Sequence, residues 1–204
     1  MKVIVSVQPK SASSRGLVHY IAHSKLDSSR EPLGREIFNE QSGEISVEKA
    51  NSLLNDEITK KRPANEELHH LVISLKPEDF ERLGENEKER TESLKMITRH
   101  TIKQLENELD ADRLNWAAGI HQNSEFPHVH IAIQKTYFDK NLEKKHLGKI
   151  PTGLLPHYEN TETKGKVFAP GILIEAATEK LEEIQQTKVK LRDSQKHKSQ
   201  TQLT

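Results

Sequence analysis

The chain has 204 residues, enough for one domain with a sizeable core, or one domain and a tail. It carries 31 basic and 31 acidic residues, and the resulting net charge of zero argues against a generic, uniformly basic nucleic-acid binder. The absence of cysteine excludes disulfide and thiolate-metal frameworks, and the absence of a long apolar run excludes a signal peptide or membrane span, so we expect a soluble cytoplasmic protein.

The pattern of apolar residues predicts an α/β chain. In chain order, the predicted elements are a strand at 2–7, a helix at 13–24, a short strand at 35–39, a helix at 47–60, a strand at 69–75, a short helix from Pro77 to Gly84, a long helix at 87–109, strands at 114–121 and 127–135, an irregular stretch at 136–168 and a last helix at about 172–188. The loop between the last two strands is too short for a crossover helix, so these strands must be antiparallel.

These elements predict a central, mainly antiparallel sheet of four or five strands, flanked by helices, with a central hairpin. The last residues, 188–204, are rich in Lys, Gln and Ser and lack apolar periodicity. They predict a disordered polar tail or the start of a linker, which leaves residues 1–187 as the folded domain.

Three histidines lie on the two strands of the predicted hairpin. His128 and His130 alternate along its second strand, so their side chains share one face, about 6.6 Å apart. His121 ends the first strand, where the same alternation places it on one face with Ala117 and Gly119. If the two strands pair, the three imidazoles converge above a floor of small residues that leaves room for a substrate.

A lone histidine on a strand is usually a structural residue. Packing alone gains nothing from clustering three groups that repel one another when protonated, so the pattern predicts a metal site at His121, His128 and His130. Three imidazoles suit zinc, manganese, iron or nickel, whereas magnesium prefers oxygen ligands and would need phosphate and water to complete its shell. Three protein ligands leave positions open, which is typical of a catalytic site.

Basic residues are concentrated in two segments despite the neutral total. Residues 1–30 carry five Lys or Arg against one acid, and residues 135–166 carry seven Lys against four acids. Because both segments flank elements expected near the histidines, they predict a local field that attracts phosphate, although either segment alone is more simply a solvated loop. The expected contacts are Arg15, Lys25, Lys135, Lys144, Lys145 and Lys149.

Three motifs, in the expected order, resemble those of plasmid mobilisation relaxases of the MobA/VirD2 type, which are HUH single-strand endonucleases. The most specific is His-x6-His-x-His followed by Ile-Ala-Ile-Gln-Lys, which spans residues 121–135 and resembles the third motif. Residues 16–21, Gly-Leu-Val-His-Tyr-Ile, resemble the first motif, and residues 69–74, His-His-Leu-Val-Ile-Ser, resemble the second.

The resemblance implies a metal-dependent DNA relaxase that nicks one strand at a plasmid transfer origin for conjugative mobilisation. Tyr20 would be the nucleophile that forms a covalent 5′-phosphotyrosyl intermediate, and His121 would serve catalysis as well as metal binding. The implied cofactor is a divalent ion, magnesium or manganese first and other transition metals as alternatives. Ser74 and Asn123 would lie near the DNA.

One residue departs from the family pattern. Asn123 stands where the family commonly has an aspartate that orients the first imidazole. An amide can accept the same hydrogen bond but adds no negative charge. The implied partners are single-stranded DNA at an origin of transfer, an accessory nicking protein and a type IV secretion coupling protein, without insertion into a membrane.

Two other classes of protein share parts of the pattern. A rolling-circle replication initiator or transposase-type nickase would keep the histidines but recognise a different DNA origin. A metal-dependent hydrolase or oxygenase of small molecules, or an inactive single-stranded-DNA-binding remnant, would not need Tyr20. Aromatic residues make up 4% of the chain, which leaves few side chains for stacking on bases. The candidates are Trp116, Phe126, Tyr137, Phe138 and Tyr158.

Overall fold

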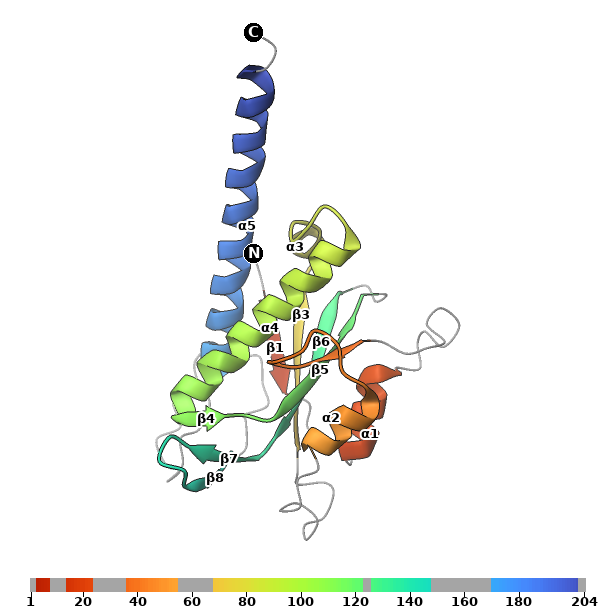
Figure 1. The fold of residues 1–204 in the computed structure, drawn as a ribbon, viewed down its shortest axis with the longest axis vertical. Coiled ribbons are helices and arrows are strands. Elements are labelled where there is room, and N and C mark those ends of the chain that lie inside the picture. Colours follow the sequence, from red (N-terminus) through yellow and green to blue (C-terminus); the bar gives the residue numbers. More distant parts are fainter. Residues whose placement is uncertain are drawn as a thin grey trace.

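The computed structural model describes residues 3–7, 14–23, 36–54, 68–122, 126–147 and 170–201 (Figure 1). The helices in these ranges are α1 (Ser14–Ala22), α2 (Val47–Leu54), α3 (Pro77–Glu81), α4 (Glu87–Leu109) and α5 (Pro170–Thr201). The strands are β1 (Val3–Val7), β2 (Ile37–Phe38), β3 (Leu68–Leu75), β4 (Ala111–Arg113), β5 (Trp116–His121), β6 (His128–Gln134), β7 (Thr136–Asp139) and β8 (Lys144–His146).

The centre of the fold is a five-stranded sheet in the order β1-β3-β6-β5-β2, in which every neighbouring pair is antiparallel. This confirms the predicted antiparallel sheet with helices around it. The middle strand, β6, pairs with β3 on one side and with β5 on the other. The β5–β6 register places His121 opposite His128 and Gly119 opposite His130. The histidine-bearing hairpin is therefore central, as the sequence predicts.

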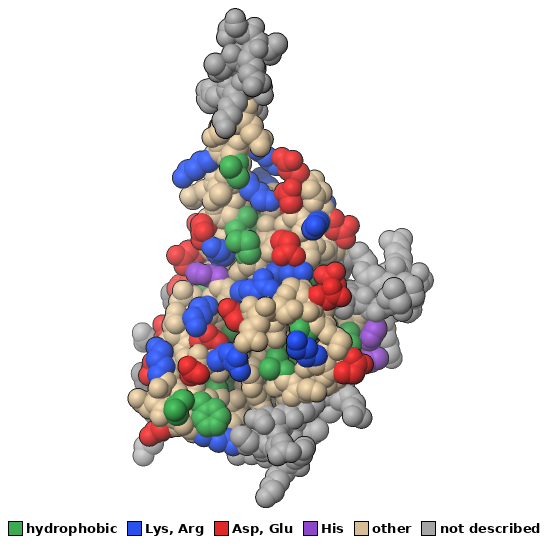
Figure 2. All heavy atoms as spheres, in the orientation of Figure 1, with side chains coloured by type: hydrophobic (Ala, Val, Ile, Leu, Met, Phe, Trp, Pro, Cys, Tyr) green, Lys and Arg blue, Asp and Glu red, His purple; other side chains and the backbone are tan. Residues whose placement is uncertain are grey.

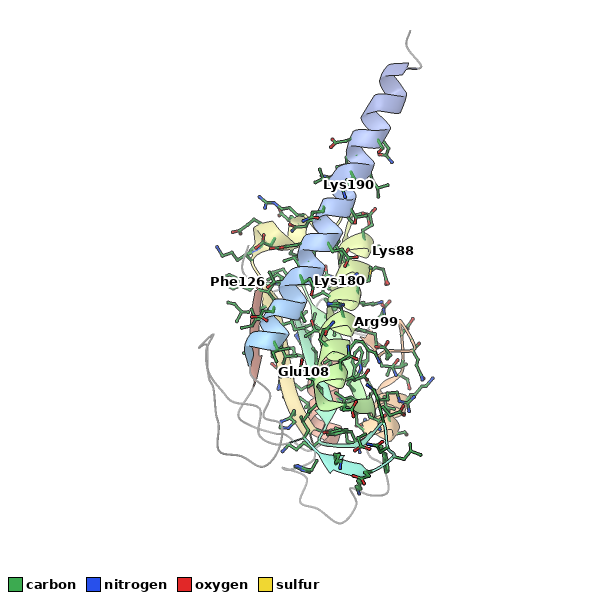
Figure 3. All side chains as sticks on the ribbon, turned by 90° about the vertical axis from the view of Figure 1, so that its left-hand side faces the viewer. Lys88, Arg99, Glu108, Phe126, Lys180 and Lys190 are labelled. Atoms are coloured by element: carbon green, nitrogen blue, oxygen red, sulfur yellow. The ribbon has the colours of Figure 1, made fainter. Side chains whose placement is uncertain are left out.

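Two separate apolar clusters cover the two faces of this sheet. Val129, Ile131 and Ile133 of β6 are fully buried in the larger cluster, to which α4 and α5 contribute. Ala132 points the other way, into a smaller cluster with residues of α1 and α2. Figures 1 and 3 show α5 lying along α4. Side chains alternate along β6, so its apolar residues point to one face of the sheet and its histidines point to the other face, which α1 covers.

Helix α4 follows its predicted bounds and has clear signals at both ends. The Asn86 side chain caps its start by accepting a hydrogen bond from the Glu89 backbone N–H at 3.0 Å. Asp110 ends it in the left-handed region at φ 53°. The apolar residues that repeat along one side of α4 are all buried. They are Leu94, Ile97, Ile102, Leu105 and Leu109.

The structure corrects the expectation that residues 136–168 are irregular throughout. Within the described residues of that stretch, β7 and β8 form a hairpin that joins β4 in a second, three-stranded sheet. The Asp139 carboxylate fixes its turn by accepting hydrogen bonds from the backbone N–H groups of Asn141 and Glu143, each at 2.9 Å. The strands are too short, and too polar in β8, for alternation to reveal them.

The C-terminal segment also differs from expectation. Helix α5 continues to Thr201, where the sequence predicts a disordered polar tail or the start of a linker from 188. Lys188 forms an ion pair with Glu89 at 3.0 Å, and Arg192 forms one with Glu85 at 3.4 Å. Lys, Gln and Arg are good helix formers, so a polar segment beside oppositely charged residues of another element can be helical without an apolar stripe.

None of the helices in the described part of the chain combines the length and the apolarity needed to cross a membrane.

Gly119 allows α1 to approach the sheet closely. A Cβ atom at this position would lie 2.6 Å from Ile21 Cγ2 and 3.1 Å from the Ile21 carbonyl oxygen. We expect Gly119→Ala to push α1 outward and to lower the free energy of unfolding by about 1–3 kcal/mol. Gly43→Ala is the control, since its Cβ would only touch Lys95 Nζ at 3.8 Å. Equal urea midpoints for the two variants would contradict the tight contact.

Candidate metal centre and nucleophile

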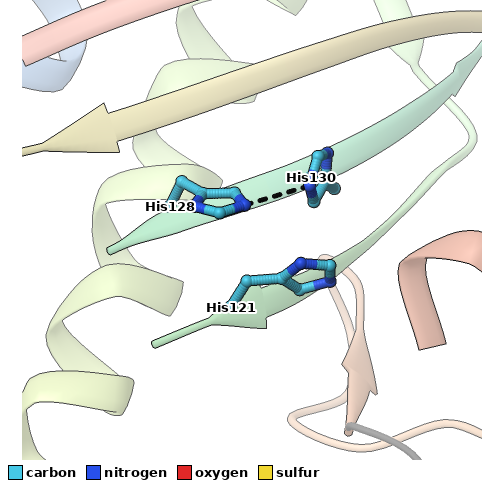
Figure 4. Close-up of side chains that lie close together, drawn as sticks. All are labelled: His121, His128 and His130. Carbon is cyan, nitrogen blue, oxygen red and sulfur yellow. Dashed lines mark hydrogen bonds between the residues drawn. The ribbon is translucent and has the colours of Figure 1, made fainter. Parts of the chain in front are cut away.

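The three predicted histidines converge in the folded protein. Their ring centroids are separated by 4.4 Å for His121 and His130, 4.8 Å for His128 and His130, and 5.1 Å for His121 and His128. One nitrogen from each ring lies within 4.8 Å of the other two (Figure 4). His121 and His130 are buried, while His128 is partly exposed. The cluster can therefore hold a small cation and remain open on the side of His128.

Two of the rings have a nitrogen tied to a backbone carbonyl. His121 Nε2 donates to the Ile21 carbonyl at 2.9 Å, and His128 Nδ1 donates to the Phe126 carbonyl at 2.8 Å. Because a carbonyl oxygen can only accept, each of these nitrogens carries the ring proton. The unprotonated nitrogens are then Nδ1 of His121 and Nε2 of His128, which are available as ligands.

The contact between His128 and His130 tests whether a cation fits. Their Nε2 atoms lie 3.1 Å apart. Because Nε2 of His128 is unprotonated, either Nε2 of His130 carries the ring proton and donates it to His128, or a metal ion lies between the two nitrogens. Neutral imidazoles with fixed tautomers are suitable ligands for a transition-metal ion. The donor set therefore fits a divalent metal.

The predicted nucleophile lies beside this cluster. Tyr20 is 45% exposed, and its ring centroid is 5.1 Å from that of His130 and 6.3 Å from that of His121. Helix α1 holds it there because Leu17 and Ile21 of the same helix are buried in the smaller core. The apolar face of α1 thus anchors the helix on the sheet, while Tyr20 remains accessible at the edge of the site.

A fourth histidine joins the site, although the sequence pattern does not single it out. His70 on β3 is 8% exposed, and its Nε2 lies 2.8 Å from Nδ1 of His130. Burial lowers the pKa of His70 from 6.5 to about 4, so its imidazole is neutral at pH 7. The signal was present in the second motif, because Ser74 and His70 are four residues apart on a strand and therefore share a face.

Among the predicted DNA contacts whose side chains the structure describes, Ser74 is the one that lies beside the histidines. It pairs with His128 in the β3–β6 register and is partly buried. Arg15 belongs to α1, close in sequence to Tyr20, but its side chain lies outside the described part. Lys25, Asn123 and Lys149 also lie outside the described residues.

The remaining predicted lysines lie away from the cluster. Lys135 follows β6, and Lys144 and Lys145 belong to β8, so all three are at the opposite end of the β5–β6 hairpin from His128. Lys145 is paired with Asp139 at 3.3 Å and also with Glu143. Figure 2 shows basic and acidic side chains intermingled over the face turned to the viewer. The described lysines of this basic segment therefore lie at the end of the hairpin away from the histidines, and their contact with DNA stays a prediction.

The aromatic candidates for base stacking divide by exposure. Trp116 is 1% exposed and packs edge-on against Phe38, and Tyr137 is 9% exposed, so neither ring is available to a base. Phe126 and Phe138 are 48% and 43% exposed. Phe126 lies two residues before the start of β6, and its backbone carbonyl accepts a hydrogen bond from His128, which places Phe126 next to the cluster. Tyr158 lies outside the described residues.

The fold is similar to solved structures of the conjugative relaxase TrwC in complex with oriT DNA. The metal-bound structure matches with a TM-score of 0.58 at 14% identity, over 90% of this chain and 70% of that chain. The metal-free structure matches with a TM-score of 0.53 at 15% identity, over 90% and 69%. The copper-bound structure matches with a TM-score of 0.50 at 14% identity, over 91% and 70%. The chain therefore shares its fold with these structures.

The sequence profile of the family described as MobL relaxases matches residues 9–201. The chain belongs to this family. The resemblance to relaxases is thus confirmed, whereas the narrower resemblance to the MobA/VirD2 type is not. A comparison with curated proteins gave no match.

Proposed function

We propose that this protein nicks one strand of plasmid DNA at an origin of transfer and stays attached to the cut strand through Tyr20. The observation that carries the proposal is the position of an exposed tyrosine ring 5.1 Å from a ring of the three-histidine cluster. Membership of the MobL relaxase family supports DNA nicking as the activity. The related TrwC structures contain oriT DNA, which supports single-stranded origin DNA as the substrate.

The proposed reaction is a transesterification. The Tyr20 hydroxyl oxygen attacks the phosphorus, a new P–O bond forms to tyrosine, and the bond from phosphorus to the 3′ oxygen breaks. The phenolic proton is lost and the 3′ oxygen gains one, so the products are a 5′-phosphotyrosyl ester and a free 3′-hydroxyl. One ester replaces another, and the strand can be resealed by the reverse reaction without a nucleotide cofactor.

His121, His128 and His130 would hold a divalent cation in this scheme. When bound, such an ion would neutralise negative charge on the scissile phosphate. His121 serves twice, because its Nε2 is tied to the Ile21 carbonyl, directly after Tyr20 in the chain. This hydrogen bond links the helix that carries the nucleophile to a metal ligand. The nitrogen donors favour manganese or another transition metal over magnesium.

The DNA path is expected to run from Tyr20 and Ser74 past the exposed Phe126 ring. Arg15, Lys25 and Asn123 adjoin this region in sequence and remain our proposed contacts there. Accessory nicking and coupling proteins, and action in the bacterial cytoplasm, follow from the same proposal.

The lysines on and near β8 provide a separate test of the DNA path. Replacing Lys144, Lys145 and Lys149 together with Gln is expected to weaken single-strand binding. The slope of log affinity against log salt should fall by about 0.7 for each phosphate that the variant no longer neutralises. Lys190→Gln is the control, because Figure 3 shows Lys190 on the part of α5 that projects beyond the sheet. An unchanged slope in the triple variant would exclude β8 from the DNA path.

The direct test of the function is covalent capture. The protein is incubated with a pool of single-stranded transfer-origin oligonucleotides and manganese, and a denaturation-resistant protein–DNA adduct is expected. Capture on replication origins and not on transfer origins would instead indicate a replication initiator. The absence of an adduct on every sequence would contradict the proposed nicking activity.

A further inference from the structure

His70 is bonded to a metal-ligand candidate from a neighbouring strand. Its Nε2 lies 2.8 Å from Nδ1 of His130, and the two ring centroids are 5.0 Å apart. We propose that His70 is a positioning residue that accepts a hydrogen bond from His130 Nδ1 and holds His130 in the tautomer whose Nε2 faces the cluster. The inference rests on the proposed function, because it assigns a task within that metal centre.

The direction of the hydrogen bond follows from the contacts of the two ring nitrogens of His130. Nε2 of His130 faces Nε2 of His128 at 3.1 Å, so this is the end that belongs to the cluster. A histidine that coordinates a cation through Nε2 keeps its proton on Nδ1, which must therefore donate. The acceptor at that end is Nε2 of His70, whose proton is then on Nδ1.

The same arrangement exists for the other two histidines, with different acceptors. His121 donates to the Ile21 carbonyl and His128 to the Phe126 carbonyl. Each ring thus has one nitrogen held by a partner and the other facing the cluster, the usual arrangement around protein-bound metals. Of these three hydrogen bonds, the one from His130 ends on a side chain, so its acceptor can be changed by substitution.

The surroundings make this hydrogen bond important. His70 and His130 are 8% and 6% exposed, so removal of the acceptor would leave a buried N–H without compensation from water. The Tyr20 ring lies edge-on to both imidazoles, with centroid distances of 6.1 Å to His70 and 5.1 Å to His130. The rotation of the His130 ring therefore affects both the metal centre and the packing of the nucleophile.

A role as a fourth metal ligand fits the geometry less well. The group of described residues whose ligand atoms approach one another consists of His121, His128 and His130, and His70 is outside it. Nε2 of His70 is directed at Nδ1 of His130, which is the nitrogen of that ring farther from the cluster. His70 therefore acts on the metal through His130.

The experiment compares side chains by their reach. Gln at position 70 can place an amide oxygen where His70 has Nε2, whereas Asn is too short and Leu cannot accept a hydrogen bond. Calorimetry with manganese alone is expected to show wild-type affinity for His70→Gln. A reduction of about 10- to 100-fold is expected for His70→Asn and His70→Leu. His69→Leu is the matched control, because His69 is equally buried on the same strand but contacts the Leu147 carbonyl.

A second measurement uses the protein loaded with zinc, which is diamagnetic and suits imidazole ligands. Nitrogen-15 NMR of the histidine rings should show His130 coordinating through Nε2, with its proton on Nδ1, in the wild type and in His70→Gln, and coordinating through either nitrogen in His70→Asn. Equal manganese affinity in the Gln and Asn variants, or coordination of His130 through Nδ1 in the wild type, would overturn the role of His70. Wild-type protein that binds neither manganese nor zinc would instead overturn the metal centre itself, and with it the task assigned to His70.

Discussion

Tyr20→Phe is expected to fold, bind manganese and bind single-stranded DNA like the wild type, but to form no covalent adduct. The ring is retained, so its edge-on packing against His70 and His130 persists. The substitution removes the hydroxyl oxygen that becomes part of the phosphotyrosyl ester. We expect no other group in the site to form a covalent bond to the DNA in its place. The measurement is a denaturing gel after incubation with a cleavable oligonucleotide and manganese, together with a native gel for binding.

The wild-type adduct should exceed the mass of the protein by that of the fragment on the 3′ side of the cut. Tyr137→Phe is the matched control, because Tyr137 is 9% exposed and belongs to the second sheet. It should form the adduct normally. An adduct that persists in Tyr20→Phe, or a DNA-linked peptide that contains Tyr137 or Tyr158, would identify a different nucleophile.

His128→Ala is expected to abolish cleavage and to weaken manganese binding. The loss of affinity should exceed the roughly 10- to 100-fold loss that is typical when a residue that only orients a metal ligand is removed. It removes one of three proposed ligands, and two rarely hold a labile ion. His128 is the best choice of the three because it is partly exposed, so truncation leaves the fold largely intact. Chelation of divalent ions in the wild type should stop cleavage in the same way.

His146→Ala is the control for this variant, since His146 is an exposed histidine on β8 in the second sheet. Calorimetry and the cleavage gel should both give wild-type results for it. Unchanged manganese affinity in His128→Ala would show that the cluster is not the metal centre. Cleavage by the wild type in the presence of excess chelator would show that nicking does not depend on the metal.

The sequence by itself determined the hairpin and the residues that it presents. A strand has a period of two, so His128 and His130 had to share one face, and the short loop before them required an antiparallel partner. The apolar pattern of residues 87–109 likewise predicted helix α4, because helical periodicity depends only on residues close together in the chain. These features depend on neighbours in sequence, and they survived in the folded protein.

Only the tertiary structure decided which distant segments complete the site. His70 reaches His130 because β3 pairs with β6 in one particular register, and the Ile21 carbonyl reaches His121 because Gly119 lets α1 approach β5. Likewise, α5 extends to Thr201 while ion pairs join it to Glu85 and Glu89. Such contacts depend on pairing and packing between segments far apart in the chain, so the periodicity of the local sequence does not predict them.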